Sequence, residues 1–277
     1  MKTIILIPFG GLANRLRAIA SGLALRESEN VQLKILWIDR PELNCPYNEL
    51  LEGIAGVSIK NVSNNYFWKA LLRYIKTVSL PGFSVITDDF IKEELEEGYF
   101  GLKANYKSFW KGRLKEKNLI ISCRKFYKYS FKEMNLLKPH NSILTKLNSF
   151  VIANDLKNFI GFHIRYTDNQ LSLDHSPIEL FELRIKECLA NGEKIVVCTD
   201  SDFIKERLSK EFENRIIFPL ITRNRTSIEG LQDAYFELLL LSRSEKIYAS
   251  YGSTFSLYAS ELGGCELSLM KVKEKTE

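Results

Sequence analysis

The chain opens with MKTIILIPFGGLANRLRAIA, residues 1–20. Lys2–Ile7 is an apolar run of strand length, Leu12–Arg26 is an Ala- and Leu-rich helical run, and Gly10 and Gly11 stand between them. This order is typical of the first strand and first helix of a parallel α/β sheet. Because the N–H groups that open a helix attract anions, the turn also predicts an anion site.

Side chains beside this turn can complete such a site. Asn14 can cap the helix or contact a ligand, and Arg15 or Arg17 can pair with a phosphate group. The alternative is an ordinary strand-to-helix turn with solvated arginines. The segment matches neither the P-loop motif nor the GxGxxG fingerprint, so on its own it leaves both interpretations open.

Strand-length apolar runs alternate with helical patterns through most of the chain. Further strands are expected at Leu33–Ile38, Val57–Val62, Phe83–Thr87, Leu119–Ser122, Asn158–Arg165, Lys194–Thr199, Ile216–Phe218 and Lys246–Ala249. Helices are expected at Phe67–Ile75, His140–Val151, Pro177–Ala190, Asp202–Glu211, Ser227–Leu241 and Thr254–Leu262, with helices and loops at the rim of the first unit over Glu93–Tyr129. The alternation predicts an α/β fold of two Rossmann-like units with mostly parallel sheets, residues 1–150 and 151–277.

Composition narrows the class of protein. The formal net charge of +5 is too small to favour a nucleic-acid-binding protein. The five cysteines are odd in number, widely spaced and free of CxxC pairs, which favours reduced thiols in a cytoplasmic protein. We expect no signal peptide and no transmembrane segment, while peripheral contact with a membrane surface stays open.

Polar side chains follow two expected strands of the second half, where ligands of parallel sheets bind. In HIRYTDN, residues 163–169, His163 and Arg165 share one face of the strand, and an arginine there can hold a diphosphate. The alternative is a core histidine beside an Arg165–Asp168 ion pair. In CTDSD, residues 198–202, Asp200 and Asp202 form a DxD pattern that can hold Mg²⁺ or Mn²⁺. We favour Asp202 as a helix cap and leave Asp200 a ligand-contacting or structural role.

Two further segments at strand ends offer hydroxyls and carboxylates. In SYGSTFS, residues 250–256, Ser253, Thr254 and Ser256 begin a helix after a glycine, which suits a phosphate group or a simple helix cap. Asp88 and Asp89 follow an expected strand of the first unit, and Asp39 follows another. These three carboxylates are candidate proton acceptors, and ordinary helix capping is the alternative for Asp88 and Asp89.

Four of these segments, in this order, resemble one family. The chain looks like the superfamily of alpha-1,2-, alpha-1,6- and protein O-fucosyltransferases, and most like the alpha-1,6 branch that includes the rhizobial chitin-oligosaccharide enzyme. The resemblance rests on GGLANR (residues 10–15), HIRYTD (163–168), CTD (198–200) and STFS (253–256). The motifs span nearly the whole chain, and each of them is short.

The resemblance implies a GT-B-like fold and an inverting, metal-independent transfer of fucose from GDP-fucose to a glycan acceptor, with the acceptor on the side of the first domain. It implies that Arg165 holds the diphosphate and neutralises the leaving group. Asp88 is our candidate for the second catalytic residue, a proton acceptor. No cofactor is expected besides the donor substrate. The expected substrate-binding residues are Gly10, Gly11, Asn14, Arg15, His163, Asp168, Asp200, Ser253, Thr254, Phe255 and Ser256.

One departure from the family keeps two alternatives open. Tyr166 stands where the alpha-1,6 enzymes have the second arginine of an RRTD segment, which removes one cation near the phosphates. The first alternative is a glycosyltransferase with another nucleotide sugar, in one version metal-dependent through Asp200 and Asp202. The second is a non-catalytic module that binds a nucleotide or a polysaccharide. The sequence names neither the acceptor nor the linkage.

Overall fold

The computed structural model describes residues 1–62, 81–97, 101–222, 224 and 226–272. The helix expected over Phe67–Ile75 lies outside these ranges. The chain divides into two compact units. The first unit comprises Met1–His140 with Asn224–Leu231, and the second comprises Asn141–Arg223 with Gln232–Glu277.

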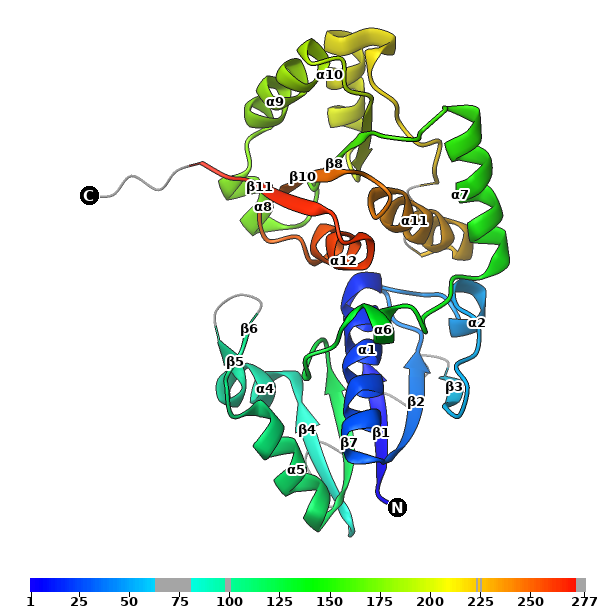
Figure 1. Ribbon diagram of the computed structural model, residues 1–277, viewed down its shortest axis with the longest axis vertical. Coiled ribbons are helices and arrows are strands. Elements are labelled where there is room, and N and C mark those ends of the chain that lie inside the picture. The colour runs from blue at the N-terminus through cyan, green and yellow to red at the C-terminus, as the bar shows by residue number, and fades with distance from the viewer. Residues whose placement is uncertain (63–80, 98–100, 223, 225, 273–277) are drawn as a thin grey trace, which may run out of the picture. The chain divides into compact units, whose positions relative to one another are not determined.

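The first unit contains a five-stranded sheet in the order β3-β2-β1-β7-β4 (Figure 1). Its strands are β1 (Thr3–Pro8), β2 (Gln32–Ile38), β3 (Ser58–Val62), β4 (Phe83–Thr87) and β7 (Asn118–Cys123). All four pairings between neighbouring strands are parallel. The carboxyl ends of the five strands therefore share one edge of the sheet, the edge at which open α/β sheets bind ligands.

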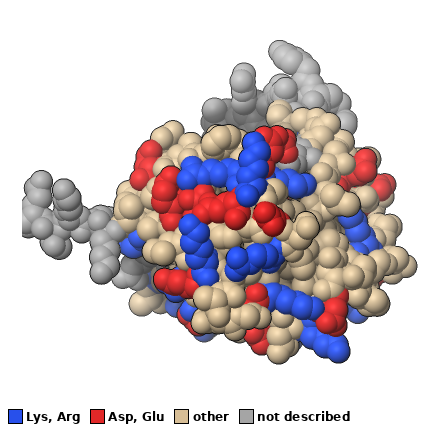
Figure 2. All heavy atoms as spheres, turned by 90° about the horizontal axis from the view of Figure 1, so that it is seen from above, with Lys and Arg blue, Asp and Glu red and all other residues tan. Residues whose placement is uncertain are grey.

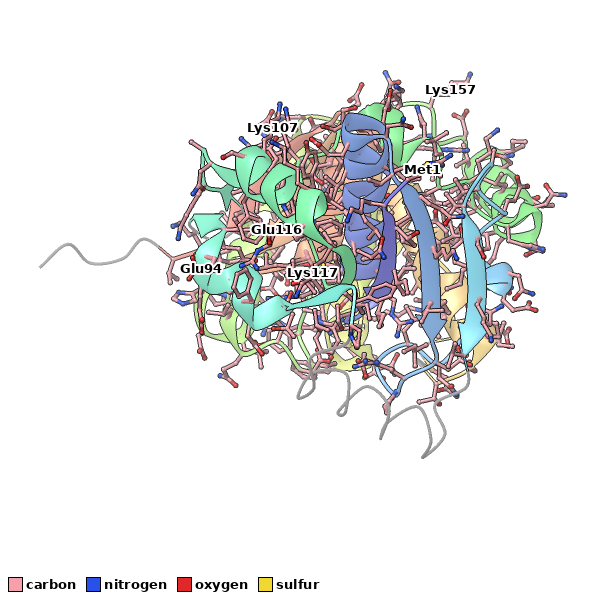
Figure 3. The ribbon with its side chains drawn as sticks, turned by 90° about the horizontal axis from the view of Figure 1, so that it is seen from below. Met1, Glu94, Lys107, Glu116, Lys117 and Lys157 are labelled. Carbon is pink, nitrogen blue, oxygen red and sulfur yellow. The ribbon has the colours of Figure 1, made fainter. Side chains whose placement is uncertain are left out.

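Helix α1 (Leu12–Glu29) lies along this sheet (Figure 1). A Cβ at Gly22 would come within 3.0 Å of Leu6, so the glycine permits the close approach of helix and strand. Figure 3 shows the opposite, amino-terminal edge, where α5 (Tyr106–Glu116) ends near the labelled Glu116. There the Lys2 Nζ donates to the Glu116 carbonyl at 3.0 Å. The other elements are α2 (Tyr47–Leu50), α4 (Asp88–Glu94), α5 (Tyr106–Glu116), α6 (Phe131–Met134), β5 (Glu96–Glu97) and β6 (Gly101–Leu102).

The second unit contains a four-stranded parallel sheet in the order β11-β10-β8-β9. Both β8 and β9 are buried along their whole length, as expected of sheet strands covered on both faces. The strands are β8 (Ile160–Ile164), β9 (Ile195–Thr199), β10 (Lys246–Ser250) and β11 (Glu266–Met270). The helices are α7 (Asn141–Ala153), α8 (Gln170–His175), α9 (Ile178–Ala190), α10 (Asp202–Phe212), α11 (Ile228–Leu241), α12 (Thr254–Gly263) and the 3₁₀ turn η1 (Glu213–Arg215).

The predicted α/β class with two mostly parallel sheets is confirmed, with three differences. The strand expected at Ile216–Phe218 is wrong, because Ile217 makes only a single parallel bridge, to Val196. The rim position expected for Glu93–Tyr129 is wrong for β7, which lies inside the sheet between β1 and β4. The sequence reasoning also missed β11 and α8.

The surface carries charges of both signs close together. Figure 2 shows basic and acidic side chains interspersed on the face that it draws. On α9 and α10, Arg207 pairs with Glu179 and Glu182, and Lys186 pairs with Glu211. Among the helices in the described ranges, none is long and apolar enough to cross a membrane. All five cysteines are free thiols, in agreement with their spacing in the sequence.

Candidate functional site

Arg165 follows the last residue of β8, at the carboxyl edge of the second unit's sheet. Its backbone N–H donates to the Ser250 Oγ at 3.0 Å, at the end of the neighbouring β10. Its guanidinium Nη1 lies 3.1 Å from the Asp200 Oδ2, and its Nη2 pairs with Asp168. The side chain is 25% exposed, so a cation held in place by two carboxylates still reaches solvent at this edge.

The Asp200 carboxylate fixes the loop after β8, which contains Arg165. Besides the contact with Arg165, its carboxylate accepts hydrogen bonds from the Tyr166 N–H at 2.8 Å and from the Thr167 Oγ1 at 2.6 Å. Asp168 differs, because its side chain is 57% exposed. An exposed ion pair contributes little stability, so an anion can displace Asp168 from Arg165 more easily than it can displace Asp200.

The DxD pattern does not place Asp202 as expected. The helix cap of α10 is Ser201, whose Oγ accepts a hydrogen bond from the Ile204 N–H at 3.3 Å. Asp202 is the first residue of the helix and is exposed. The preference for Asp202 as the cap is therefore wrong, because the extended backbone of the preceding serine lets its hydroxyl reach the third residue of the helix. The described part of the chain contains no group of three or more His, Cys, Asp or Glu side chains that could hold a metal ion.

His163 lies in β8 next to the start of α12. Its Nδ1 is 3.3 Å from the Ser253 Oγ, and its ring stacks on the Phe255 ring at 4.9 Å between centroids. Ser253 is in the N-cap position of α12 but makes no capping hydrogen bond there. Because its hydroxyl faces the histidine instead, the N–H groups of the first turn, from Thr254 on, have no side-chain cap. The Ser256 Oγ donates to the Ser253 carbonyl at 3.2 Å, a contact within the helix.

The second unit thus brings most of its predicted site residues to one edge of its sheet. These are the cation and its partners, the stacked pair and the start of α12: His163, Arg165, Asp168, Asp200, Ser253, Thr254 and Phe255. Ser250 belongs to the same edge and was missed as a contact of the arginine. Its position at the end of an expected strand was visible, but only the strand order shows that β10 lies beside β8.

In the first unit, the two glycines of the opening turn differ in conformation. Gly10 has φ +82°, and a Cβ there would lie 3.1 Å from the Asn14 Nδ2. Gly11 has φ −69°, and a Cβ there would meet no atom within 4 Å. Gly10 therefore makes the turn, and Gly11 leaves the backbone that opens α1 accessible.

Arg15 is fully buried beneath this turn. Its Nε donates to the Gly10 carbonyl at 2.9 Å, its Nη1 donates to the Ile38 carbonyl at 2.8 Å, and the guanidinium lies 4.6 Å from the centre of the Trp37 ring. Burial lowers the pKa of Arg15 below its ordinary value. Arg17 is also buried, and its Nε donates to the Tyr129 hydroxyl at 3.2 Å. The alternative of solvated arginines is therefore wrong, because both side chains are held by the surrounding structure.

Asp88 is the first residue of α4, at the same edge of the first unit's sheet. Its Oδ1 and Oδ2 accept from the Arg124 Nε at 3.2 and 3.0 Å, and Oδ1 also accepts from the Arg124 backbone N–H at 3.1 Å. Lys92 is a second ion-pair partner. Thr87 caps α4, and Asp89 is exposed. Both oxygens of Asp88 are thus already engaged, by an arginine that the sequence reasoning did not connect with it.

Comparison with known proteins gives structural matches only: no protein-family model and no curated sequence matches the chain. The NodZ alpha-1,6-fucosyltransferase soaked with GDP-fucose, an enzyme whose structure is also known from Bradyrhizobium, is 18% identical, with a TM-score of 0.60 over 94% of this chain and 92% of that chain. An FUT1 mutant from Arabidopsis thaliana in complex with GDP is 15% identical, with a TM-score of 0.64 over 99% and 71%. POFUT1 in its apo form is 11% identical, with a TM-score of 0.58 over 98% of each chain.

At these identities the similarity establishes the fold. The GT-B-like α/β architecture predicted from the sequence is confirmed, and it is the fold of the fucosyltransferase structures over nearly the whole chain.

Proposed function

We propose that this protein is an inverting glycosyltransferase that moves fucose from GDP-fucose to a glycan acceptor. The observation that carries the proposal is the placement of Arg165 at the same edge of the second unit's sheet as His163, Ser253 and the uncapped start of α12. The fold supports it, because NodZ and POFUT1 have been solved with GDP-fucose and FUT1 with GDP.

Arg165 acts on the leaving group. Cleavage of a glycosyl–diphosphate bond builds negative charge on the departing phosphate, and a cation fixed in advance stabilises that charge where it develops. Asp200 holds the guanidinium in place, and the exposed Asp168 yields its position to the incoming diphosphate. The N–H groups that open α12, near Thr254, add hydrogen-bond donors for a phosphate oxygen.

The other predicted residues bind the donor around this centre. His163, held by Ser253 and stacked on Phe255, presents an imidazole to a sugar or phosphate oxygen. In the first unit we assign Gly11 and Asn14 to substrate binding at the opening turn, and the same unit takes the acceptor. Arg15 stabilises this turn, because its side chain donates both to the Gly10 carbonyl and to the Ile38 carbonyl at the end of β2.

The transfer needs no metal ion and no cofactor. This part of the proposal is supported by the contacts of Asp200, whose carboxylate already holds Tyr166, Thr167 and Arg165, and by the exposed position of Asp202 on α10. Five free thiols suit a reducing compartment, so we assign the reaction to the cytoplasm.

A second candidate is the same chemistry with a different nucleotide sugar. It is favoured by Tyr166, which packs against the core of the second unit and supplies no cation at this edge. A thermal-shift comparison of GDP and GDP-fucose with UDP and ADP separates the two candidates.

The test of the proposed function is the release of GDP from GDP-fucose by the wild type and by Arg165→Ala. Loss of one preorganised donor to a developing oxyanion slows an enzyme by about 10²–10³-fold. We expect a loss of that size, together with weaker GDP binding. The control is Arg184→Ala, which removes an arginine of α9 that pairs with Glu187 of the same helix. Equal turnover and equal GDP affinity in the wild type and Arg165→Ala would contradict the assignment.

A further inference from the structure

In the described part of the first unit, three buried polar side-chain atoms lack a hydrogen-bond partner, and two of the residues that carry them, Arg15 and Asp39, lie close enough to interact electrostatically. Within the described ranges, the buried side-chain nitrogen and oxygen atoms without a hydrogen-bond partner are Asn14 Oδ1, Arg15 Nη2 and Asp39 Oδ1. Asn14 and Arg15 open α1 directly after β1, and Asp39 directly follows β2. Since β1 and β2 are parallel neighbours, the three residues share the ligand-binding edge of the sheet. Buried polar groups are normally satisfied, so such a cluster indicates a polar ligand.

The chemistry of the three atoms specifies that ligand. Arg15 Nη2 is a hydrogen-bond donor, and the Asn14 and Asp39 oxygens are acceptors. A hydroxyl group can accept from the arginine and donate to an oxygen at the same time. Arg15 itself cannot turn away, because its Nε and Nη1 are held by two backbone carbonyls. The cluster therefore fits a hydroxyl of a sugar that binds to the first unit.

Asp39 is the member that can take a proton. Its backbone N–H donates to the Val62 carbonyl at 3.0 Å, which fixes it at the end of β2. Desolvation raises the pKa of its carboxyl group, and the nearby Arg15 acts in the opposite direction. A carboxylate that is partly desolvated and has a free oxygen is a better proton acceptor than one in water.

The two other candidate carboxylates are placed less well. Asp88 has both oxygens engaged by Arg124, and Asp89 is exposed. Asp88 also directly follows β4, which is three strand positions from β2 in the sheet order, or about 14 Å at the usual spacing of about 4.8 Å between strands. The two sites are therefore separate, and a variant of one tests that one alone.

We propose that Asp39 accepts the proton of the acceptor hydroxyl in the transfer reaction, with Arg15 as the positioning residue and Asn14 as a second contact of that hydroxyl. This inference rests on the proposed function. In the step, the O–H bond of the acceptor breaks and its proton moves to the Asp39 carboxylate. The acceptor oxygen forms a bond to the anomeric carbon of fucose. The bond from that carbon to the phosphate oxygen breaks, and its electron pair leaves with GDP.

The experiment compares nucleophiles that need a proton acceptor with one that does not. GDP release from GDP-fucose is measured with water, with a chitin oligosaccharide and with azide, an anion that attacks without losing a proton. In Asp39→Asn we expect the reactions with water and the oligosaccharide to slow by about 10²–10⁴-fold, the usual contribution of a general base. The azide reaction should stay within a few-fold of the wild type, and GDP affinity should not change. Glu42→Gln, on the exposed loop after β2, is the matched control.

Two results would overturn the assignment. One is an Asp39→Asn enzyme with wild-type rates toward water and the oligosaccharide, above all if Asp88→Asn loses those rates and regains turnover with azide. The other is loss of every reaction, azide included, in an enzyme that still binds GDP and melts at the wild-type temperature. If Asp39→Asn melts early, Asp39→Glu keeps a carboxylate and should retain part of the water reaction. A wild type that binds GDP but turns over GDP-fucose with none of the nucleophiles contradicts the proposed function, and the role of Asp39 with it.

Discussion

The Arg165 Nη1 lies 3.1 Å from the Asp200 Oδ2, and the same carboxylate accepts from the backbone N–H of Tyr166. One side chain thus sets both the path of the loop after β8 and the direction of the cation that ends the strand. We predict that Asp200→Asn lowers kcat/KM by about 10²-fold, the usual effect of misplacing a catalytic group by about 1 Å. Measurement of kcat/KM for GDP release checks this prediction. Full activity of the variant would show that Asp200 does not position Arg165 for catalysis.

A metal-binding role for Asp200 would produce a similar loss, so the variant needs a second measurement. We predict that EDTA leaves the wild-type rate unchanged and that added Mg²⁺ or Mn²⁺ does not restore Asp200→Asn. Asp202→Asn should also keep full activity, because its side chain is exposed on α10. Loss of activity in EDTA that Mn²⁺ restores would favour the metal-dependent alternative.

The same substitution to alanine is expected to have different effects at the two glycines of the opening turn, on stability at Gly10 and on ligand binding at Gly11. Gly10→Ala forces a side chain into φ +82°, close to Asn14, so we expect a loss of about 1–2 kcal/mol in the free energy of unfolding. Gly11→Ala meets neither strain nor contact and should leave stability unchanged while it weakens GDP-fucose binding. Urea unfolding and ligand titration separate the two effects. Equal stability of the two variants would contradict the turn geometry.

We predict that replacing the buried Arg15 by lysine lowers the free energy of unfolding more than the same replacement at Arg26. Arg15→Lys keeps the charge but cannot make both hydrogen bonds to the carbonyls of Gly10 and Ile38. Because a hydrogen bond to a charged group contributes about 1.5–3 kcal/mol, we expect a loss of roughly 3 kcal/mol in urea unfolding. Arg26→Lys in the same helix changes a single exposed contact, with Ala55, and should cost under about 0.5 kcal/mol. Similar losses in the two variants would show that burial of Arg15 does not stabilise the turn.

The raised pKa of Asp39 predicts an acid limb in the pH profile. A carboxyl group accepts a proton only when it is ionised, so kcat/KM should fall as the pH drops through a pKa above the ordinary value of about 3.9. Arg15 and Cys45 interact electrostatically with Asp39, and Arg15 interacts in turn with Arg40 and Glu42. Cys45 stays neutral because burial raises its thiol pKa to about 12. Asp39→Asn should lack the limb. An unchanged limb in that variant would assign it to another group.

The same pKa shift predicts the direction of a stability effect. A carboxyl pKa that is higher in the folded than in the unfolded protein means that the folded state binds more protons between the two values. Stability then decreases as the pH rises through that window. Removal of the charge in Asp39→Asn should leave the protein at least as stable at neutral pH, which supports the use of this variant. A large drop in melting temperature would contradict this expectation.

Much of the fold could be predicted because its strands are short apolar runs separated by glycine turns. The runs that became β1, β2, β8 and β9 are clear in the sequence, and the first two glycines do mark the turn between β1 and α1. β11 was missed because its burial is only partial and it follows the end of α12 after two residues. The position of β7 inside the sheet depends on which strands pair, and local patterns do not encode that.

The candidate site was predictable to a similar degree. Strand ends and residue types predicted that His163, Arg165 and Asp200 lie at one edge of the second unit's sheet, and the structure places them there. They did not show that Ser201 caps α10, or that Arg15 turns inward to the end of β2. Those outcomes depend on hydroxyl reach and on carbonyls that are distant in the sequence, so only the three-dimensional structure reveals them.

The central claim is that the second unit binds a guanosine diphosphate sugar without a metal ion. A thermal-shift titration of the whole protein with GDP, GDP-fucose, UDP and ADP, each with and without EDTA, tests it most directly. A ligand at 100 times its Kd adds about 2.7 kcal/mol to the stability of the folded state, which raises the melting temperature measurably. We predict that the melting temperature rises with GDP and GDP-fucose alone, that the rise is the same in EDTA, and that it is smaller in Arg165→Ala. A rise with UDP instead, or one that requires a metal ion, would contradict it.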